Sequence, residues 1–393
     1  MKVFIINTGS SSLKFKLFEM PAETLVCSGM VERIGGEMQQ LSYQSERGEV
    51  NETMELKTHR AALTKVVELL LDPDIGVITT KEDIRLFGHR VVHGGDRFSG
   101  TVRIDEAVRN EIRRFASLAP LHNPPNLEGI EVAEEVFPDS PHFAVFDTGF
   151  HQTIPAMARR YAVPDFVYSE YGVQVYGFHG ISHEYVSRKA IDYLGIRDSR
   201  IITLHLGNGC SMTAVRNGKS IDHSMGFSPS DGLIMGTRSG DIDQGAIFHM
   251  IRHHGYQPEE VNTLLTRKSG MLGLTGHADL RDVESRASEG DEVCALAMQM
   301  NAYRIRKYIG SYAAAMNGLD AIVFTAGIGE NSVMMRQLVC MDMEYLGIEL
   351  DAGKNENVSG DLTSIGTNGS RVSILVIPTN EELEIARQVS GAV

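Results

Sequence analysis

The stretch VFIINTGSSSLKFKLF, residues 3–18, indicates the fold class of this 393-residue chain. Residues 3–6 are continuously apolar, whereas residues 13–18 alternate between apolar and polar side chains. A short apolar run is typical of a buried strand, and strict alternation is typical of a strand with one covered face. The polar residues 7–12 between the two runs therefore predict a strand, a tight turn and a second strand.

The same pattern returns about 200 residues later. Residues 201–206 (IITLHL) form an apolar run, residues 207–211 (GNGCS) form a second glycine-containing turn, and residues 212–215 continue as a strand. Self-similarity at such a separation predicts two lobes of similar construction. Coincidence is the alternative, because hairpins with turns of this kind are common.

Outward from these hairpins, apolar runs alternate with helical periodicity, which favours an α/β protein. We expect helices that begin at Asp105 and at Asn380, and a third over residues 186–194 that ends at Gly195. Further strands are expected at 143–146, 322–324 and 373–377, a glycine turn at 325–331, and surface loops over 351–371.

Composition excludes several classes of partner and compartment. Lys and Arg total 37 against 51 Asp and Glu, so the formal net charge is −14, which disfavours nucleic acid and anionic membranes as partners. Four widely spaced cysteines are typical of a reducing compartment. No run approaches the ~18 apolar residues of a membrane span, and the first residues lack a signal-peptide pattern. We therefore expect a cytoplasmic protein.

Three turns rich in Gly, Asn, Ser or Thr directly follow predicted strands, at 7–12, 207–211 and 325–331. Glycine lets backbone N–H groups approach an anion closely, so the three turns together favour phosphate binding. Neither standard phosphate motif fits. Met212 and Ser332 occupy the third glycine position of G-x-G-x-x-G, and Thr213 replaces the first glycine of a P-loop.

Two arginines lie among glycines, Arg90 within residues 88–97 and Arg238 within residues 223–243. A guanidinium on such a loop can clamp a phosphate or carboxylate as a fork, although a purely structural hydrogen-bonding role is the alternative.

Two histidine pairs, 89/93 and 179/183, have the spacing of zinc ligands on a helix. Neighbouring glycines argue against a helix at both places. Neutral imidazoles that donate hydrogen bonds near an anionic site are the better functional interpretation.

Taken together, these segments resemble the acetate kinase family. Matching segments occur in the family's order along the chain, at 7–15, 88–95, 120–124, 146–153, 176–180, 205–209, 236–243, 327–331 and 378–382. The resemblance implies the two-lobed, duplicated actin-like (ribonuclease H-like) fold with a nucleotide cleft between the lobes. Residues 1–150 with 380–393 would form the N-terminal lobe on the substrate and metal side, and residues 151–379 the nucleotide-binding lobe.

The resemblance implies reversible transfer of the γ-phosphoryl group of ATP to acetate, which yields acetyl phosphate and ADP in a Mg²⁺-dependent, direct in-line reaction. Mn²⁺ is the alternative ion. Members of the family are usually homodimers. A propionate kinase with the same machinery is the nearest alternative, because one methylene is worth only ~1–3 kcal/mol in such a pocket. A non-catalytic nucleotide-binding module of the actin or Hsp70 type is the alternative from a different class.

By the resemblance, five residues carry the reaction chemistry. Arg90 would bind the substrate carboxylate or the acyl phosphate. Arg238 and His179 would donate to the equatorial oxygens of the transferring phosphoryl group, where negative charge is greatest, and His122 would support them. Asp147 would position the metal or its water shell, since acetate is already ionised and no proton needs to move.

The resemblance also implies the binding sites. Asn7 and Glu381 would complete the Mg²⁺ site. The pocket for the substrate methyl group would comprise Val92, Leu121, Phe178 and Pro229. The residues around the nucleotide would be Lys14, His205, Leu206, Gly207, Asn208, Gly209, Asp279, Leu280, Arg281, Gly327, Ile328, Gly329, Glu330 and Asn331. Two departures from the family pattern stand out: residues 228–231 read SPSD where TPLE is common, and Ala326 replaces a frequent glycine.

Overall fold

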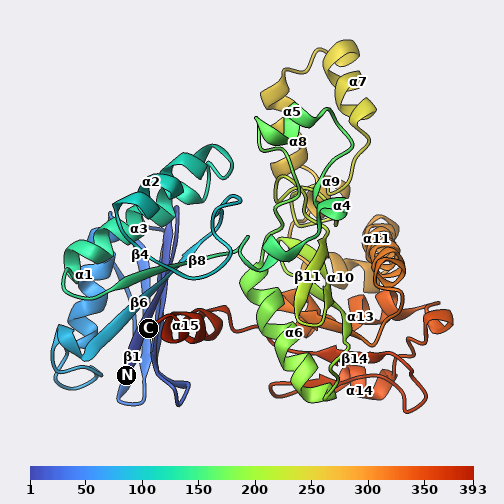
Figure 1. The fold of residues 1–393 in the computed structure, drawn as a ribbon. Helices are drawn as coiled ribbons and strands as arrows, with labels where there is room; N and C mark the ends of the chain where they lie inside the picture. Colours follow the sequence, from blue (N-terminus) through green and yellow to red (C-terminus); the bar gives the residue numbers. More distant parts are fainter. The chain divides into compact units, whose positions relative to one another are not determined.

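The computed structural model describes all 393 residues, and they divide into two compact units. Met1–Gln152 and Asn380–Val393 form unit 1, and Thr153–Thr379 form unit 2 (Figure 1). None of the helices combines the length and the apolar character needed to cross a lipid bilayer.

Unit 1 is built on an eight-stranded sheet with the order β5-β4-β3-β2-β1-β6-β8-β7. Its strands are β1 (Lys2–Gly9), β2 (Ser12–Glu19), β3 (Thr24–Glu32), β4 (Gln39–Ser45), β5 (Gly48–Met54), β6 (Ile84–Val91), β7 (Val102–Arg103) and β8 (His142–Phe146). Its helices are α1 (His59–Leu70), α2 (Glu106–Arg114), α3 (Asn123–Val136) and α15 (Glu381–Gly391).

Unit 2 is built on a six-stranded sheet with the order β11-β10-β9-β12-β14-β13. Its strands are β9 (Arg200–Leu206), β10 (Cys210–Arg216), β11 (Lys219–His223), β12 (Ala321–Thr325), β13 (Thr363–Ser364) and β14 (Ser373–Val376). Its helices are α4 (Ala156–Arg159), α5 (Asp165–Ser169), α6 (Gly180–Leu194), α7 (Gln244–His254), α8 (Pro258–Arg267), α9 (Gly270–Thr275), α10 (Leu280–Ser288), α11 (Glu292–Met316), α12 (Ala326–Asn331), α13 (Val333–Cys340) and α14 (Ala352–Glu356).

The two sheets share one topology at their centres. In unit 1, β1 pairs antiparallel with β2 and parallel with β6, which in turn pairs parallel with β8. In unit 2, β9 pairs antiparallel with β10 and parallel with β12, which pairs parallel with β14. A further antiparallel strand, β3 or β11, follows on the outer side of each hairpin. The duplication expected from the two hairpins is therefore confirmed.

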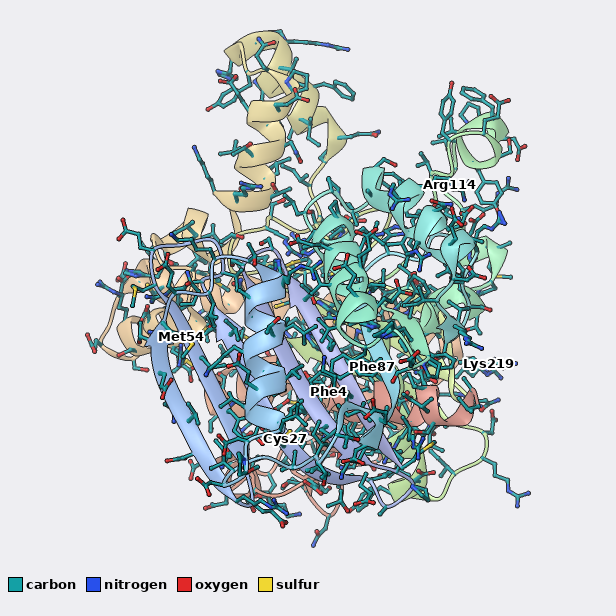
Figure 2. The ribbon with its side chains drawn as sticks, turned by 90° about the vertical axis from the view of Figure 1, so that its left-hand side faces the viewer. Phe4, Cys27, Met54, Phe87, Arg114 and Lys219 are labelled. Carbon is teal, nitrogen blue, oxygen red and sulfur yellow. The ribbon has the colours of Figure 1, made fainter.

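Successive residues of β1 point to opposite faces of the unit 1 sheet. Phe4 and Ile6 belong to the core that also includes residues of α1 and α3. Figure 2 shows Phe4 beside Phe87 of β6, and their ring centroids are 5.7 Å apart. Helix α15 packs against β1 and β6 on the face that Ile5 shares with Gly88. A Cβ atom on Gly88 would lie 2.7 Å from the side chain of Ile385 in α15, so glycine permits this close approach.

Most expected elements are present with the expected character. Asp105 caps α2 by accepting a hydrogen bond from the N–H of Val108 at 2.8 Å, and Asn380 caps α15.

Three expectations about secondary structure were wrong. Helix α6 begins at Gly180 and includes His183, so the glycine does not exclude a helix there. Residues 326–331 form the short helix α12 after the strand, where a turn was expected. The segment 351–371 contains α14 and β13 in addition to loops.

Candidate functional site

In unit 1, three charged residues meet beyond the carboxyl ends of the parallel strands. Arg90 is the penultimate residue of β6, Asp147 directly follows β8, and Glu381 is the first residue of α15. Nε and Nη2 of Arg90 donate to Oδ1 and Oδ2 of Asp147 at 2.9 and 2.8 Å. Nη1 of Arg90 lies 3.5 Å from Oε2 of Glu381. One guanidinium thus faces two carboxylates in a largely buried position.

A second group of charges lies on the same face of the sheet, on the β1–β2 hairpin. Asn7 pairs with Lys14 across the hairpin. Nζ of Lys14 lies 2.6 Å from Oε1 of Glu382, and Nζ of Lys16 lies 2.9 Å from Oε2 of the same buried carboxylate. Lys16 also donates to Oδ1 of Asn380 at 3.3 Å. These bonds fasten the start of α15, and with it Glu381, to the hairpin.

The electrostatics of these groups follow from their burial and their partners. Burial, followed by repulsion from Asp147 and Glu382, raises the pKa of Glu381. Burial opposes the charge of Arg90, but Asp147 and Glu381 raise its pKa above the ordinary value. Burial alone would raise the pKa of Glu382, yet the two lysines lower it to about 2. The carboxylates around Glu381 therefore give this region an excess of negative charge, which a bound cation would neutralise.

Three other residues expected to act here lie near the same end of unit 1. The N–H of Val92, one residue beyond β6, donates to Oδ1 of Asn126 at 3.1 Å. His122 is the residue before α3, and Leu121 beside it has a side chain that is 58% exposed. Leu121 is thus free of the hydrophobic core of unit 1.

In unit 2, His179 lies at the amino end of α6 in a left-handed backbone conformation with φ of 56°. Its Nδ1 is 2.9 Å from Oγ of Ser211, and its ring stacks on that of His205 with centroids 4.2 Å apart. His183 reaches the same Ser211 hydroxyl through Nε2 at 2.8 Å. The hydroxyl group of Ser211 in β10 therefore orients the imidazole. No group of three or more His, Cys, Asp or Glu side chains is placed to hold a metal ion.

Arg238 converges with His179 over the turn between β9 and β10. A Cβ atom on Gly209 would lie 3.5 Å from Cε1 of His179 and 3.6 Å from Nη1 of Arg238. Nη1 of Arg238 donates to the carbonyl of Pro229 at 2.8 Å, and burial lowers the pKa of Arg238. The two donors therefore meet at a turn whose backbone carries no side chain at this point. Phe178, which precedes His179, is buried.

A cavity of about 690 Å³ opens beside this turn in unit 2. Eight of the residues expected to surround the nucleotide line it, namely Gly207, Asn208, Asp279, Leu280, Arg281, Gly327, Ile328 and Asn331. Asp279 caps α10 and accepts from the exposed Arg281, whose hydrogen bonds lower the pKa of Asp279 to about 2. The size of the cavity and its mixed apolar and polar lining suit a drug-sized ligand.

Five of the expected nucleotide residues of unit 2 do not line the cavity: His205, Leu206, Gly209, Gly329 and Glu330. Oε1 of Glu330 instead accepts a hydrogen bond from the N–H of Thr379 at 3.1 Å. Lys14, the remaining one, lies in unit 1.

The sequence reasoning missed nine residues that line the cavity: Cys210, Ile234, Met235, Gly236, Met271, Ala278, Glu284, Asn301 and Ser332. Gly236 carried a signal, because it belongs to the glycine-rich segment around Arg238. A Cβ atom on Gly236 would collide with the side-chain amide of Asn208. The main-chain carbonyl of Asn208 accepts a hydrogen bond from the N–H of Gly236 at 3.0 Å. Asn301, in the middle of the long helix α11, carried none.

Comparisons with known proteins agree over nearly the whole chain. Residues 2–387 match the model of the Acetokinase family. The chain is 59% identical to the acetate kinase of Flavobacterium johnsoniae over 389 residues, which cover 99% of this chain and 98% of that protein.

Two solved structures also resemble the chain closely. The Porphyromonas gingivalis acetate kinase has a TM-score of 0.93 at 43% identity, and a propionate kinase from Francisella tularensis has a TM-score of 0.93 at 38% identity. Each alignment covers 99% of both chains. The expected fold class, with two units of actin-like topology, is thereby confirmed. From its strand order, its convergent arginine and histidine and its full-length match, the chain belongs to the acetokinase family.

Proposed function

We propose that the protein transfers the γ-phosphoryl group of ATP reversibly to acetate and forms acetyl phosphate and ADP. A carboxylate oxygen of acetate attacks the γ-phosphorus, the bond from that phosphorus to the β–γ bridging oxygen breaks, and ADP leaves with the electron pair. The observation that carries this proposal is the convergence of Arg238 and His179 over Gly209, at the rim of a cavity of nucleotide size.

Two donors at this place suit the chemistry, because nucleophile, phosphoryl group and leaving group are all anionic. Arg238 contributes a full charge that carbonyl and sulfur contacts leave uncompensated, and His179 contributes a ring held by Ser211. Donors aimed at the equatorial oxygens stabilise the charge that accumulates there in the transition state. The cavity would hold the adenosine part of ATP, with the glycine turn 207–209 at the phosphates.

In unit 1, Arg90 would bind the acetate carboxylate or the acyl phosphate. Asn7 and Glu381 offer an amide oxygen and a carboxylate, the hard ligands that Mg²⁺ or Mn²⁺ accepts, and Asp147 would orient the water shell of the ion. A metal bound there would neutralise phosphate charge. Asn7 and Glu381 would supply only two protein ligands, so phosphate and water would supply the others, as is usual for Mg²⁺.

For the acyl group, Val92, Leu121, Phe178 and Pro229 would form the small apolar pocket, with His122 as a supporting donor. The Francisella tularensis relative is named a propionate kinase, so propionate is the second candidate substrate. The ratio of kcat/KM for acetate and propionate tests this choice. A preference for propionate of tenfold or more would overturn acetate as the substrate.

We also propose a cytoplasmic homodimer. All four cysteines are free and buried, which suits a reducing compartment.

The proposed dimer would form on unit 2. Helix α7 has no buried residue and exposes Phe248, while α4 and α5 expose Met157 and Phe166. Figure 1 shows α5, α7 and α8 extending together away from the sheet of unit 2. A helix gains most of its stability from packing, so a second copy of the chain would cover this face. Phe248→Glu should then give a monomer in light scattering, whereas Tyr193→Glu on α6 should not.

The activity is tested by trapping acetyl phosphate with hydroxylamine in the presence of ATP, Mg²⁺ and acetate. Formation of the hydroxamate, and its loss in Arg238→Ala, is the expected result. Nucleotide binding without any hydroxamate from acetate or propionate would instead favour a non-catalytic module of the actin or Hsp70 type.

A further inference from the structure

The loop that presents Arg238 is closed at its base by two reciprocal hydrogen bonds. We call residues 232–241 the Arg238 loop. The N–H of Gly232 donates to Oδ1 of Asp241 at 2.8 Å, and the N–H of Asp241 donates to the carbonyl of Gly232 at 3.0 Å. Gly232 and Gly240 have φ of 84° and 66°, which only glycine adopts readily. The side chain of Asp241 thus completes the base of the loop.

A second carboxyl group, that of Asp231, directly precedes the loop. Burial, and then the neighbouring carboxylate of Asp241, raise the pKa of Asp231 to about 6. The carboxylate of Asp241 therefore lies beside a second acidic group, and the donors that contact it hold it in place.

Helix α11 braces the second of these carboxyl groups, that of Asp241, from outside the loop. Oη of Tyr308 donates to Oδ1 and Oδ2 of Asp241 at 3.1 and 3.0 Å. Nη1 of Arg304 donates to the carbonyl of Gly232 at 2.8 Å and lies 3.6 Å from Oδ2 of Asp241. The other titratable groups that interact with the pair are the phenols of Tyr161 and Tyr312. The base of the loop is therefore held from two sides.

The same base controls both ends of the hydrogen bond that orients Arg238. The guanidinium lies within the loop, and its acceptor, the carbonyl of Pro229, lies two residues before Asp231. The two hydrogen bonds between Gly232 and Asp241 fix the segment that carries the acceptor against the far end of the loop that carries the donor.

We propose that Asp241 and Tyr308 are positioning residues for phosphoryl transfer: the carboxylate of Asp241, braced by Tyr308, clasps the base of the loop so that Arg238 stays on the Pro229 carbonyl and over Gly209. This inference rests on the proposed function, because it assigns a role in aiming the phosphoryl-binding guanidinium. Neither residue lines the cavity, so both act through the guanidinium and not on the nucleotide.

The first test compares two tyrosines of the same helix. Tyr308→Phe removes the brace and should lower kcat by ~5- to 10-fold, the loss that corresponds to one ordinary net hydrogen bond. Tyr303→Phe is the matched control, because Tyr303 is 60% exposed on α11, and it should leave kcat unchanged. In an Arg238→Ala background, Tyr308→Phe should have no further effect, because the tyrosine acts through that guanidinium. A full additional loss in the double variant would overturn the proposal.

The second test changes the carboxyl group that closes the loop. Asp241→Asn keeps an oxygen that can accept from the N–H of Gly232 and from Tyr308, so kcat should stay within about twofold of the unaltered protein. Asp241→Ala should lose at least as much as Tyr308→Phe. An Asp241→Asn variant as impaired as Asp241→Ala, or two tyrosine variants of equal activity, would overturn the clasp while leaving the phosphotransferase proposal intact. Absence of acyl phosphate with the unaltered protein would overturn that proposal itself, and the clasp with it.

Discussion

The two units place different chemistry on one topology. The central strands β1, β6 and β8 of unit 1 correspond to β9, β12 and β14 of unit 2 in order and direction. At their carboxyl ends, unit 1 has Arg90 and Asp147, which pair with each other. Unit 2 has the glycine turn 207–209 after β9 and the short helix α12 after β12, beside a cavity of about 690 Å³. The difference shows that the shared sheet decides where a site forms, and that the residues at the strand ends decide what it does.

The arginines of the two units illustrate the difference most clearly. Arg90 faces two carboxylates, so its charge is compensated within the protein. Arg238 contacts a carbonyl oxygen and the sulfur of Met235, so its charge is uncompensated. An uncompensated guanidinium is available to an incoming phosphate, whereas a compensated one also serves the fold.

The largest effect is expected when Arg238 is replaced by alanine. Loss of one donor to the transition state should reduce kcat by ~10²–10³-fold. Because the guanidinium has only neutral partners, the free energy of unfolding should change by no more than about 1 kcal/mol. Rates of hydroxamate formation and urea denaturation measure the two quantities, and Arg216→Ala on an exposed end of β10 serves as control. A stability loss as large as that of an Arg90 variant would contradict the contrast.

Replacement of Arg90 by alanine should affect activity and stability together. It leaves Asp147 and Glu381 close to each other without their shared cation, and removing one partner of a buried ion pair costs about 3–5 kcal/mol. Arg90 is 19% exposed, so the loss should fall at the lower end of that range. Hydrogen exchange should show faster opening of β6 and β8, with unit 2 unchanged. Equal protection of β6 in both proteins would be inconsistent with the prediction.

Low pH should destabilise unit 1 through a buried pair of histidines. Nε2 of His89 lies 2.9 Å from Nδ1 of His142, and burial lowers the pKa of His142 to about 4 and that of His89 below its ordinary value. The unfolded chain binds protons below about pH 6.5, whereas the folded pair does not until about pH 4. Stability should therefore fall as the pH decreases through this window, by more than about 1 kcal/mol.

Hydrogen exchange at pH 7.5 and pH 5, corrected for the intrinsic exchange rate, should show this loss in β6 and β8. His142→Gln, which cannot be protonated, should flatten the pH dependence. Opening of unit 2 ahead of unit 1 on acidification would speak against the histidine pair.

The smallest effect concerns Ala326, at the start of the cavity-lining helix α12. Its φ of 63° is costly for a residue with a Cβ atom, so Ala326→Gly should raise the free energy of unfolding by about 0.5 kcal/mol. Ala314→Gly, at an exposed position inside α11, should lower it by about 1 kcal/mol. Thermal unfolding of both variants measures the difference, and a loss in both would show that the left-handed backbone of Ala326 carries no strain.

The fold class, the duplication and many of the residues at the strand ends could be predicted from the sequence. Alternation in residues 13–18 and the apolar run 201–206 reflect how each strand is buried, so these strands can be recognised without knowledge of their tertiary contacts. The caps Asp105 and Asn380 could be predicted too, because capping is local. The inference from Gly180 was wrong, since tertiary packing of α6 outweighs the low helix propensity of its first residue.

The partners of the charged groups depend on long-range packing. Lys14 and Lys16 have no acidic neighbour within two residues on either side, but α15 returns from the far end of the chain and places Glu382 2.6 Å from Lys14. Asn301 reaches the cavity from the middle of α11, and Tyr308 reaches Asp241, 67 positions away, from the same helix. These contacts depend on how the helices pack in the folded units, which local sequence patterns do not encode.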